Sequence, residues 1–204
     1  MPERLKIAVF ASGRGSNFQA LADAAKEDKL DADIGLLVCD RPAAPVVARA
    51  AAAGVEAFVF SPRDYPSREA YEAEILAELE RRGIGLVVLA GYMRILTPVL
   101  VEPYYGRMIN VHPALLPAFP GVNGIRQALD YGVKVTGVTV HMVDGGMDTG
   151  PIVAQEAVAV AEDDTEETLA ARIHPVEHRL LIDAVRRIAA GKVTLDGRKV
   201  SVRP

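Results

Sequence analysis

The chain has 204 residues, of which 50% are hydrophobic, and its 23 Lys+Arg and 27 Asp+Glu residues give a formal net charge of −4. We expect a single domain over residues 1–204 with a sizeable core, and the lack of any block of like charge argues against nucleic acid or a membrane surface as partner. No apolar run approaches the ~18 residues that span a bilayer, and the lone Cys39 excludes an intramolecular disulfide, so the reducing cytoplasm is the expected location.

The first elements predict a strand, a glycine-containing turn and a helix. Residues 5–11 are a continuous apolar run with one lysine, typical of a buried parallel strand rather than a secretory signal, and a helical pattern covers 18–30. The turn over residues 12–17, SGRGSN, brings free backbone N–H groups to a helix N-terminus, which suits a phosphate. It matches neither the dinucleotide nor the Walker pattern, and equally fits a turn in which Ser16 or Asn17 only caps the helix.

Strands and helices then alternate along the chain. Strands are predicted over 32–39, 55–60 and 84–90, and helices over 43–53 and 67–82. This alternation predicts an α/β fold, an open and mostly parallel sheet with right-handed crossovers and helices on both faces. Ser67 should cap the second of these helices, and Arg68 lies in its unfavourable first turn, either as solvated surface or for another use.

The segment from Gly91 to Leu96 follows the predicted strand over 84–90 and leads into a short helix with Thr97 as cap and Pro98 at its first position. Its Met, Ile and Leu residues fit either core packing or an apolar slot that receives a flat ring beside a crevice. We expect Arg94 to anchor this loop.

The run MINVHPALLPAFPG, residues 108–121, is where we expect the chemistry. Asn110 and His112 lie two residues apart on a strand, so both point to one face, and Pro113 ends the strand at His112. The two could donate hydrogen bonds to one oxygen if the histidine is protonated. Asp148 could reach His112 from a neighbouring strand's loop and would favour the charged imidazolium, although a structural histidine remains the alternative.

The rest of the chain continues the sheet and ends in a helix and a hairpin. Strands are predicted over 133–143 and, as an antiparallel partner, over 152–160; His141 fits either the crevice or a buried structural role. The chain should be helical from Asp163, with Asp164 or Thr165 as cap and a break or kink after Ile173 caused by Pro175. Asp196-Gly197 predicts a C-terminal hairpin over about 192–204, packed on a sheet edge.

Two motifs, NVHPALLPAFPG and TVHMVDGGMDTGPIVAQ, resemble those of the phosphoribosylglycinamide formyltransferase family, and the similarity runs from about Leu5 to about Gly191. The resemblance implies a Rossmann-like formyltransferase fold and transfer of a formyl group from 10-formyltetrahydrofolate to the amine of glycinamide ribonucleotide in purine biosynthesis. It places the catalytic trio on Asn110, His112 and Asp148.

The same resemblance assigns the binding residues. We expect a phosphate-binding half over about 1–100, a catalytic and folate-binding half over about 101–191, and a monomer or homodimer. The four histidines lack the spacing of metal ligands, so no metal is expected. The substrate residues that the resemblance implies are Gly15, Ser16, Asn17 and Glu177, although surface pairing of Glu177 with Arg179 is an alternative. The folate residues it implies are Arg68, Met93, Arg94, Ile95, Leu96, Asn110 and Asp144.

Three alternatives to this function follow from related or simpler activities. A 10-formyltetrahydrofolate hydrolase would share the catalytic half, but we expect it to carry an extra N-terminal regulatory domain. A methionyl-tRNA formyltransferase would carry an added C-terminal domain and an arginine-rich ending to the central motif. A non-catalytic nucleotide-binding module would use only the turn over residues 12–17 and would not need Asn110, His112 and Asp148 together.

Overall fold

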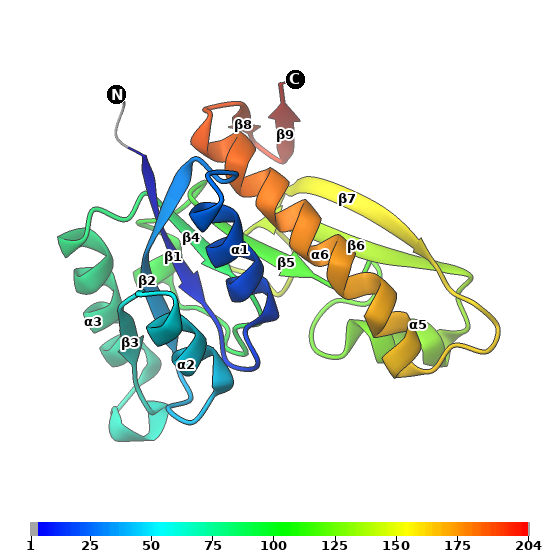
Figure 1. Ribbon diagram of the computed structural model, residues 1–204, viewed down its shortest axis with the longest axis horizontal. Helices are drawn as coiled ribbons and strands as arrows, with labels where there is room; N and C mark the ends of the chain where they lie inside the picture. The colour runs from blue at the N-terminus through cyan, green and yellow to red at the C-terminus, as the bar shows by residue number, and fades with distance from the viewer. Residues whose placement is uncertain (1–3, 204) are drawn as a thin grey trace.

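A computed structural model describes residues 4–203 of the chain. A seven-stranded sheet in the order β3-β2-β1-β4-β5-β6-β7 forms its centre (Figure 1). The strands are β1 (Leu5–Phe10), β2 (Ala32–Cys39), β3 (Ala57–Val59), β4 (Leu86–Leu89), β5 (Met108–His112), β6 (Val135–Met142) and β7 (Ile152–Ala159). The first five run parallel, whereas β6 is antiparallel to both β5 and β7. The mostly parallel sheet and the antiparallel pairing of β7 are therefore as predicted.

Helices cover both faces of the sheet because alternate side chains of its inner strands enter two separate cores. Ile7 and Val9 of β1 pack with α1 (Ser16–Lys26), α2 (Pro45–Ala52) and α6 (Glu166–Ala189). Ala8 and Phe10 pack on the other face with α3 (Arg68–Arg81) and α4 (Pro98–Val101). The α/β fold with helices on both faces is confirmed.

Several element boundaries differ from the predicted ones for local reasons. α2 begins at Pro45 rather than at residue 43, because Ala44, which precedes the proline, is held in an extended conformation. Ser67 and Thr165 cap α3 and α6 as expected. A 3-10 turn, Pro62–Asp64, precedes α3, and the short helix α5 (Gly124–Tyr131) lies between β5 and β6.

The break predicted at Pro175 is wrong, since α6 runs without interruption from Glu166 to Ala189 (Figure 1). A proline inside a helix costs about 3 kcal/mol. Leu169 and Ile173 before the proline and Leu181 and Val185 after it are all fully buried, and burying each such side chain contributes about 1.5–3 kcal/mol. Packing on both sides of Pro175 outweighs the local cost.

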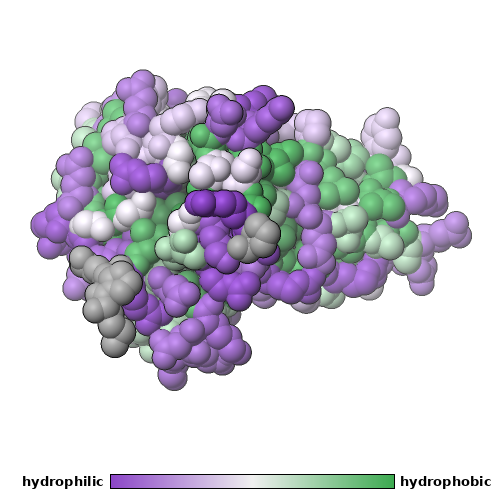
Figure 2. Space-filling view, turned by 90° about the horizontal axis from the view of Figure 1, so that it is seen from above, coloured by the Kyte–Doolittle hydropathy of each residue, from purple (hydrophilic) through white to green (hydrophobic). Residues whose placement is uncertain are grey.

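The C-terminal hairpin consists of β8 (Val193–Asp196) and β9 (Lys199–Val202), and it packs beside the edge strand β7 without joining the main sheet. Asp196 pairs with Lys199, so Gly197 and Arg198 form its turn. Figure 2, the molecule seen from above the view of Figure 1, shows hydrophilic side chains spread over this face with hydrophobic residues between them. No helix within residues 4–203 is long and apolar enough to cross a membrane.

Candidate active site

The order of the strands places the segments with the predicted site residues at one edge of the sheet. The chain moves outward from β1 through β2 to β3 and returns to β4 on the other side of β1. In open α/β sheets, ligands bind at such a reversal, beside the carboxyl ends of the strands. Ser12 follows β1, Asp40 follows β2, Gly91 follows β4 and His112 ends β5. The turns and loops that carry the predicted site residues start from this edge of the sheet or fold over it.

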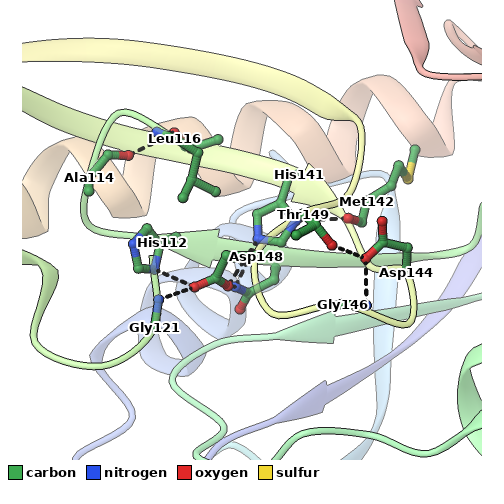
Figure 3. A network of polar contacts seen from close by, with 12 residues as sticks. His112, Ala114, Leu116, Gly121, His141, Met142, Asp144, Gly146, Asp148 and Thr149 are labelled. Atoms are coloured by element: carbon green, nitrogen blue, oxygen red, sulfur yellow. Dashed lines mark hydrogen bonds and ion pairs between the residues drawn. The ribbon is translucent and has the colours of Figure 1, made fainter. Parts of the chain in front are cut away.

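His112 is 4% exposed, and both of its ring nitrogens face oxygen atoms. Nε2 lies 2.8 Å from the Phe119 carbonyl oxygen. Nδ1 lies 3.5 Å from Oδ2 of Asp148 (Figure 3). A carbonyl oxygen and a carboxylate oxygen can only accept hydrogen bonds. Both ring nitrogens of His112 therefore face hydrogen-bond acceptors.

Asp148 lies in the loop between β6 and β7, which folds back over the sheet toward β5 (Figure 3). Its Oδ2 accepts the Gly121 N–H at 2.6 Å, and Nδ2 of Asn110 lies 3.4 Å from its Oδ1. Burial acts to raise the pKa of this carboxyl, but its contacts with two histidines and with the Gly121 N–H outweigh burial, so its pKa lies below its ordinary value. The structure thus brings Asn110, His112 and Asp148 together around an ionised carboxylate.

His141 is the second histidine that contacts Asp148. The sequence left open whether it lines the crevice or is a buried structural residue. It is 3% exposed and lies directly opposite Asn110 in the antiparallel pairing of β5 with β6. Its Nε2 is 3.1 Å from Nδ2 of Asn110 and 3.5 Å from Oδ1 of Asp148. His141 is buried, but it belongs to the polar cluster rather than to the core.

Gly15 shapes the turn between β1 and α1. It is the N-cap of α1 with φ of 75°, and no side chain caps the helix, so the interpretation of Ser16 or Asn17 as a mere cap is wrong. A Cβ at this glycine would overlap the side chain of Val46 in α2. The first N–H groups of α1 have no carbonyl partner within the helix, and Oδ1 of the buried Asn17 has no partner among the described residues. The turn therefore offers donors and an acceptor to a ligand.

Glu177 lies on α6, which packs against α1. It is 6% exposed and accepts a hydrogen bond from Nδ1 of His174 at 2.7 Å. The alternative pairing with Arg179 is wrong, since Arg179 pairs with Glu156. The bond to Glu177 raises the pKa of His174, against the opposing effects of burial and of the positive charge of Arg14. His174 and Arg14 thus place positive charge beside the turn that Gly15 begins.

The segment after β4 is held by a buried carboxylate that the sequence did not reveal. Oδ2 of Asp40 accepts Nε–H of Arg94 at 2.7 Å, and its Oδ1 accepts the Ser12 hydroxyl at 2.5 Å. The oxygen of Ser12 accepts the Met93 N–H at 2.9 Å. The expected anchoring role of Arg94 is confirmed, and Asp40 joins the ends of β1, β2 and β4.

Further hydrogen bonds hold the segment after β4, and part of this segment stays exposed to solvent. Both carboxylate oxygens of the fully buried Glu72 accept the Thr97 N–H at 3.0 Å, and Nη1 of Arg68 donates to the Ile95 carbonyl at 3.4 Å. Met93 and Ile95 remain 56% and 51% exposed. Leu96 is buried, so only part of the apolar cluster is core.

Asp144 organises the loop that carries Asp148. Its Oδ1 accepts the Gly146 N–H at 2.9 Å and the Thr149 hydroxyl at 2.7 Å (Figure 3). These bonds fold the loop back on itself. Within residues 4–203, no group of three or more His, Cys, Asp or Glu side chains is placed to hold a metal ion.

The chain matches the formyl transferase family model over residues 5–185. It is 48% identical over 183 residues to the phosphoribosylglycinamide formyltransferase of Bacillus subtilis, covering 90% of this chain and 94% of that protein. The chain belongs to the phosphoribosylglycinamide formyltransferase family. A crystal structure of glycinamide ribonucleotide transformylase 1 from Symbiobacterium toebii superposes with a TM-score of 0.97 at 42% identity, covering 100% of this chain and 96% of that one.

A formyltetrahydrofolate deformylase from Pseudomonas syringae shares the formyl transferase fold, with a TM-score of 0.90. Its identity to this chain is 26%, and the alignment covers 100% of this chain but 67% of that protein. The deformylase is thus more distant than the two formyltransferases. The comparisons favour the formyltransferase over the hydrolase.

Proposed function

We propose that this chain transfers the formyl group of 10-formyltetrahydrofolate to the primary amine of glycinamide ribonucleotide, and that Asn110, His112 and Asp148 carry out the transfer. The observation that carries the proposal is the close approach of these three side chains. Asn110 and His112 each lie within 3.5 Å of the buried Asp148 carboxylate. Membership of the phosphoribosylglycinamide formyltransferase family supports the choice of substrates.

The reaction forms a bond between the substrate nitrogen and the formyl carbon and breaks the bond from that carbon to the folate nitrogen. Negative charge develops on the formyl oxygen as the amine attacks, and the Asn110 amide and the His112 imidazolium supply donors at that moment. Asp148 holds His112 charged and oriented. It also orders a water that carries the proton from the attacking nitrogen to the departing folate nitrogen, so no covalent enzyme intermediate is needed.

The remaining residues of the site bind the two substrates. The turn of Gly15, Ser16 and Asn17 receives the ribonucleotide phosphate through its free N–H groups, and Glu177 accepts from the substrate amine or ribose hydroxyls. For the folate, Met93, Ile95 and Leu96 form the apolar slot for the ring. Arg68, Arg94, Asn110 and Asp144 complete the folate set.

A spectrophotometric assay of formyl-folate loss, with and without glycinamide ribonucleotide, tests the proposal. Loss that requires the ribonucleotide is expected, whereas equal loss without it would identify a hydrolase. Asn110→Ala should fold normally and lose about 10²–10³-fold in turnover, the usual cost of one oxyanion donor. A variant within a few-fold of wild type would remove Asn110 from the mechanism.

A further inference from the structure

His141 is a buried, titratable side chain that the catalytic scheme above does not use. It contacts both Asn110 and Asp148 from the neighbouring strand β6. A histidine can donate or accept at each ring nitrogen, so its effect on Asn110 depends on which nitrogen carries hydrogen. The surrounding contacts decide that question.

The orientation of the Asn110 amide follows from Asp148. One end of that amide lies 3.4 Å from Oδ1 of Asp148. The pKa of Asp148 lies below its ordinary value, so at neutral pH the carboxylate can only accept hydrogen bonds. An amide oxygen at this position would face another oxygen, so the nitrogen of Asn110 must point to Asp148.

The protonation of His141 follows from Asn110. Nε2 of His141 lies 3.1 Å from the same amide nitrogen, which carries only hydrogens to donate, so Nε2 must be bare. Independently, Nδ1 lies 2.8 Å from the Met142 carbonyl, which can only accept (Figure 3). The contact of Nε2 with Oδ1 of Asp148, at 3.5 Å, is too long for a hydrogen bond, so a hydrogen on Nε2 would have no acceptor. The two shorter contacts therefore indicate the neutral imidazole with its hydrogen on Nδ1.

We propose that His141 is a positioning residue that acts through Asn110: as a neutral Nδ1–H imidazole it accepts one amide hydrogen and leaves the other for the formyl oxygen. The terminal torsion of an asparagine has broad, roughly two-fold wells, so the side chain alone does not choose which end faces the substrate. Asp148 and His141 make that choice together, and the shorter contact is the one with His141. The weaker 3.4 Å contact of the second hydrogen with Asp148 is the one exchanged for the formyl oxygen. This inference rests on the proposed function.

Ring-15N histidine labelling tests the tautomer directly, without reference to activity. The chain has four histidines, and the spectrum of His141→Gln identifies the His141 signals. We expect a protonated Nδ1 and a bare Nε2 in the wild-type protein at neutral pH. A proton on Nε2, in either the other tautomer or the imidazolium, would overturn the proposal even if the enzyme is fully active.

Kinetics test whether His141 acts through Asn110. His141→Leu should lower kcat about 10-fold, with KM for each substrate within about twofold, because a misdirected donor loses less than a deleted one. In the Asn110→Ala background the same change should cost less than about twofold. An equal loss in both backgrounds would indicate a role independent of Asn110.

Two variants separate positioning from general damage to β6. His141→Gln keeps an acceptor near the position of Nε2 and should recover most of the lost kcat. Thr136→Val is the matched control on the same strand, because Thr136 is buried and its hydroxyl has no partner among the described residues. It should behave as wild type. If His141→Leu does not fold, the labelling experiment still decides, and a wild-type chain that transfers no formyl group refutes the proposed function separately.

Discussion

Asp148→Asn removes the charge at the centre of the site while keeping the size of the side chain. Oδ2 of Asp148 lies 3.5 Å from Nδ1 of His112, and the carboxylate side chain is 13% exposed. At this distance, and at an effective dielectric constant of about 20, two unit charges attract by about 5 kcal/mol. Loss of between half and all of this attraction from the transition state lowers kcat by roughly 60-fold to 3,000-fold.

The substitution should affect turnover much more than binding. The side-chain oxygen of the new amide can still accept the Gly121 N–H, which Oδ2 of Asp148 accepts at 2.6 Å in the wild type, so the loop keeps its place and KM should change little. The assay is steady-state formyl transfer with each substrate varied in turn. Asp130→Asn removes a carboxylate that pairs with Arg126 on the surface of α5, and it serves as the control with equal charge change.

Two results would refute this reasoning. The first is an Asp148→Asn variant within a few-fold of wild type in kcat. The second is an acid limb of the wild-type pH profile that disappears in the variant and has its midpoint well above pH 4, because the pKa of Asp148 lies below its ordinary value near 3.9. In that case Asp148 would titrate where the structure requires it to stay charged.

Asp40→Ala should raise KM for the folate several-fold with a smaller effect on kcat, because it frees the segment that we propose binds the ring; equal KM would refute the anchoring role. Gly15→Ala, at φ of 75°, should weaken ribonucleotide binding by at least 10-fold in titration calorimetry. His174 has a raised pKa from its bond to Glu177, so in urea unfolding the wild type should exceed His174→Gln in stability at pH 5.5 and lose that advantage by pH 8.5. Pro175→Ala should raise the free energy of unfolding by about 1–3 kcal/mol.

The features that the sequence predicted are those encoded by local patterns. Continuous apolar runs predicted the parallel strands, and the two-residue spacing of Asn110 and His112 correctly placed both on one face of β5. The turn over residues 12–17 was visible as a glycine-containing link between a strand and a helix, although its sequence equally fitted a simple helix cap. Each of these inferences depends only on residues that are close together in the sequence.

The features that the sequence did not predict depend on pairing between distant segments. His141 meets Asn110 because β6 runs antiparallel to β5, and its own strand pattern does not contain that register. Asp40 lies 54 residues from Arg94, so their ion pair is a product of the strand order. Pro175 looked like a helix end because the core that holds both halves of α6 is not a local property.

In the proposed scheme, the two histidines of the site carry opposite protonation. A buried carboxylate is costly unless it is paired and hydrogen-bonded, and Asp148 has the His112 imidazolium and the Gly121 N–H for this purpose. If His141 were also charged, the cluster would carry a net positive charge and the amide of Asn110 would turn its oxygen toward His141. With His141 neutral, the cluster is balanced before the reaction, and the positive ring of His112 and one hydrogen of Asn110 are available to the oxygen that becomes negative.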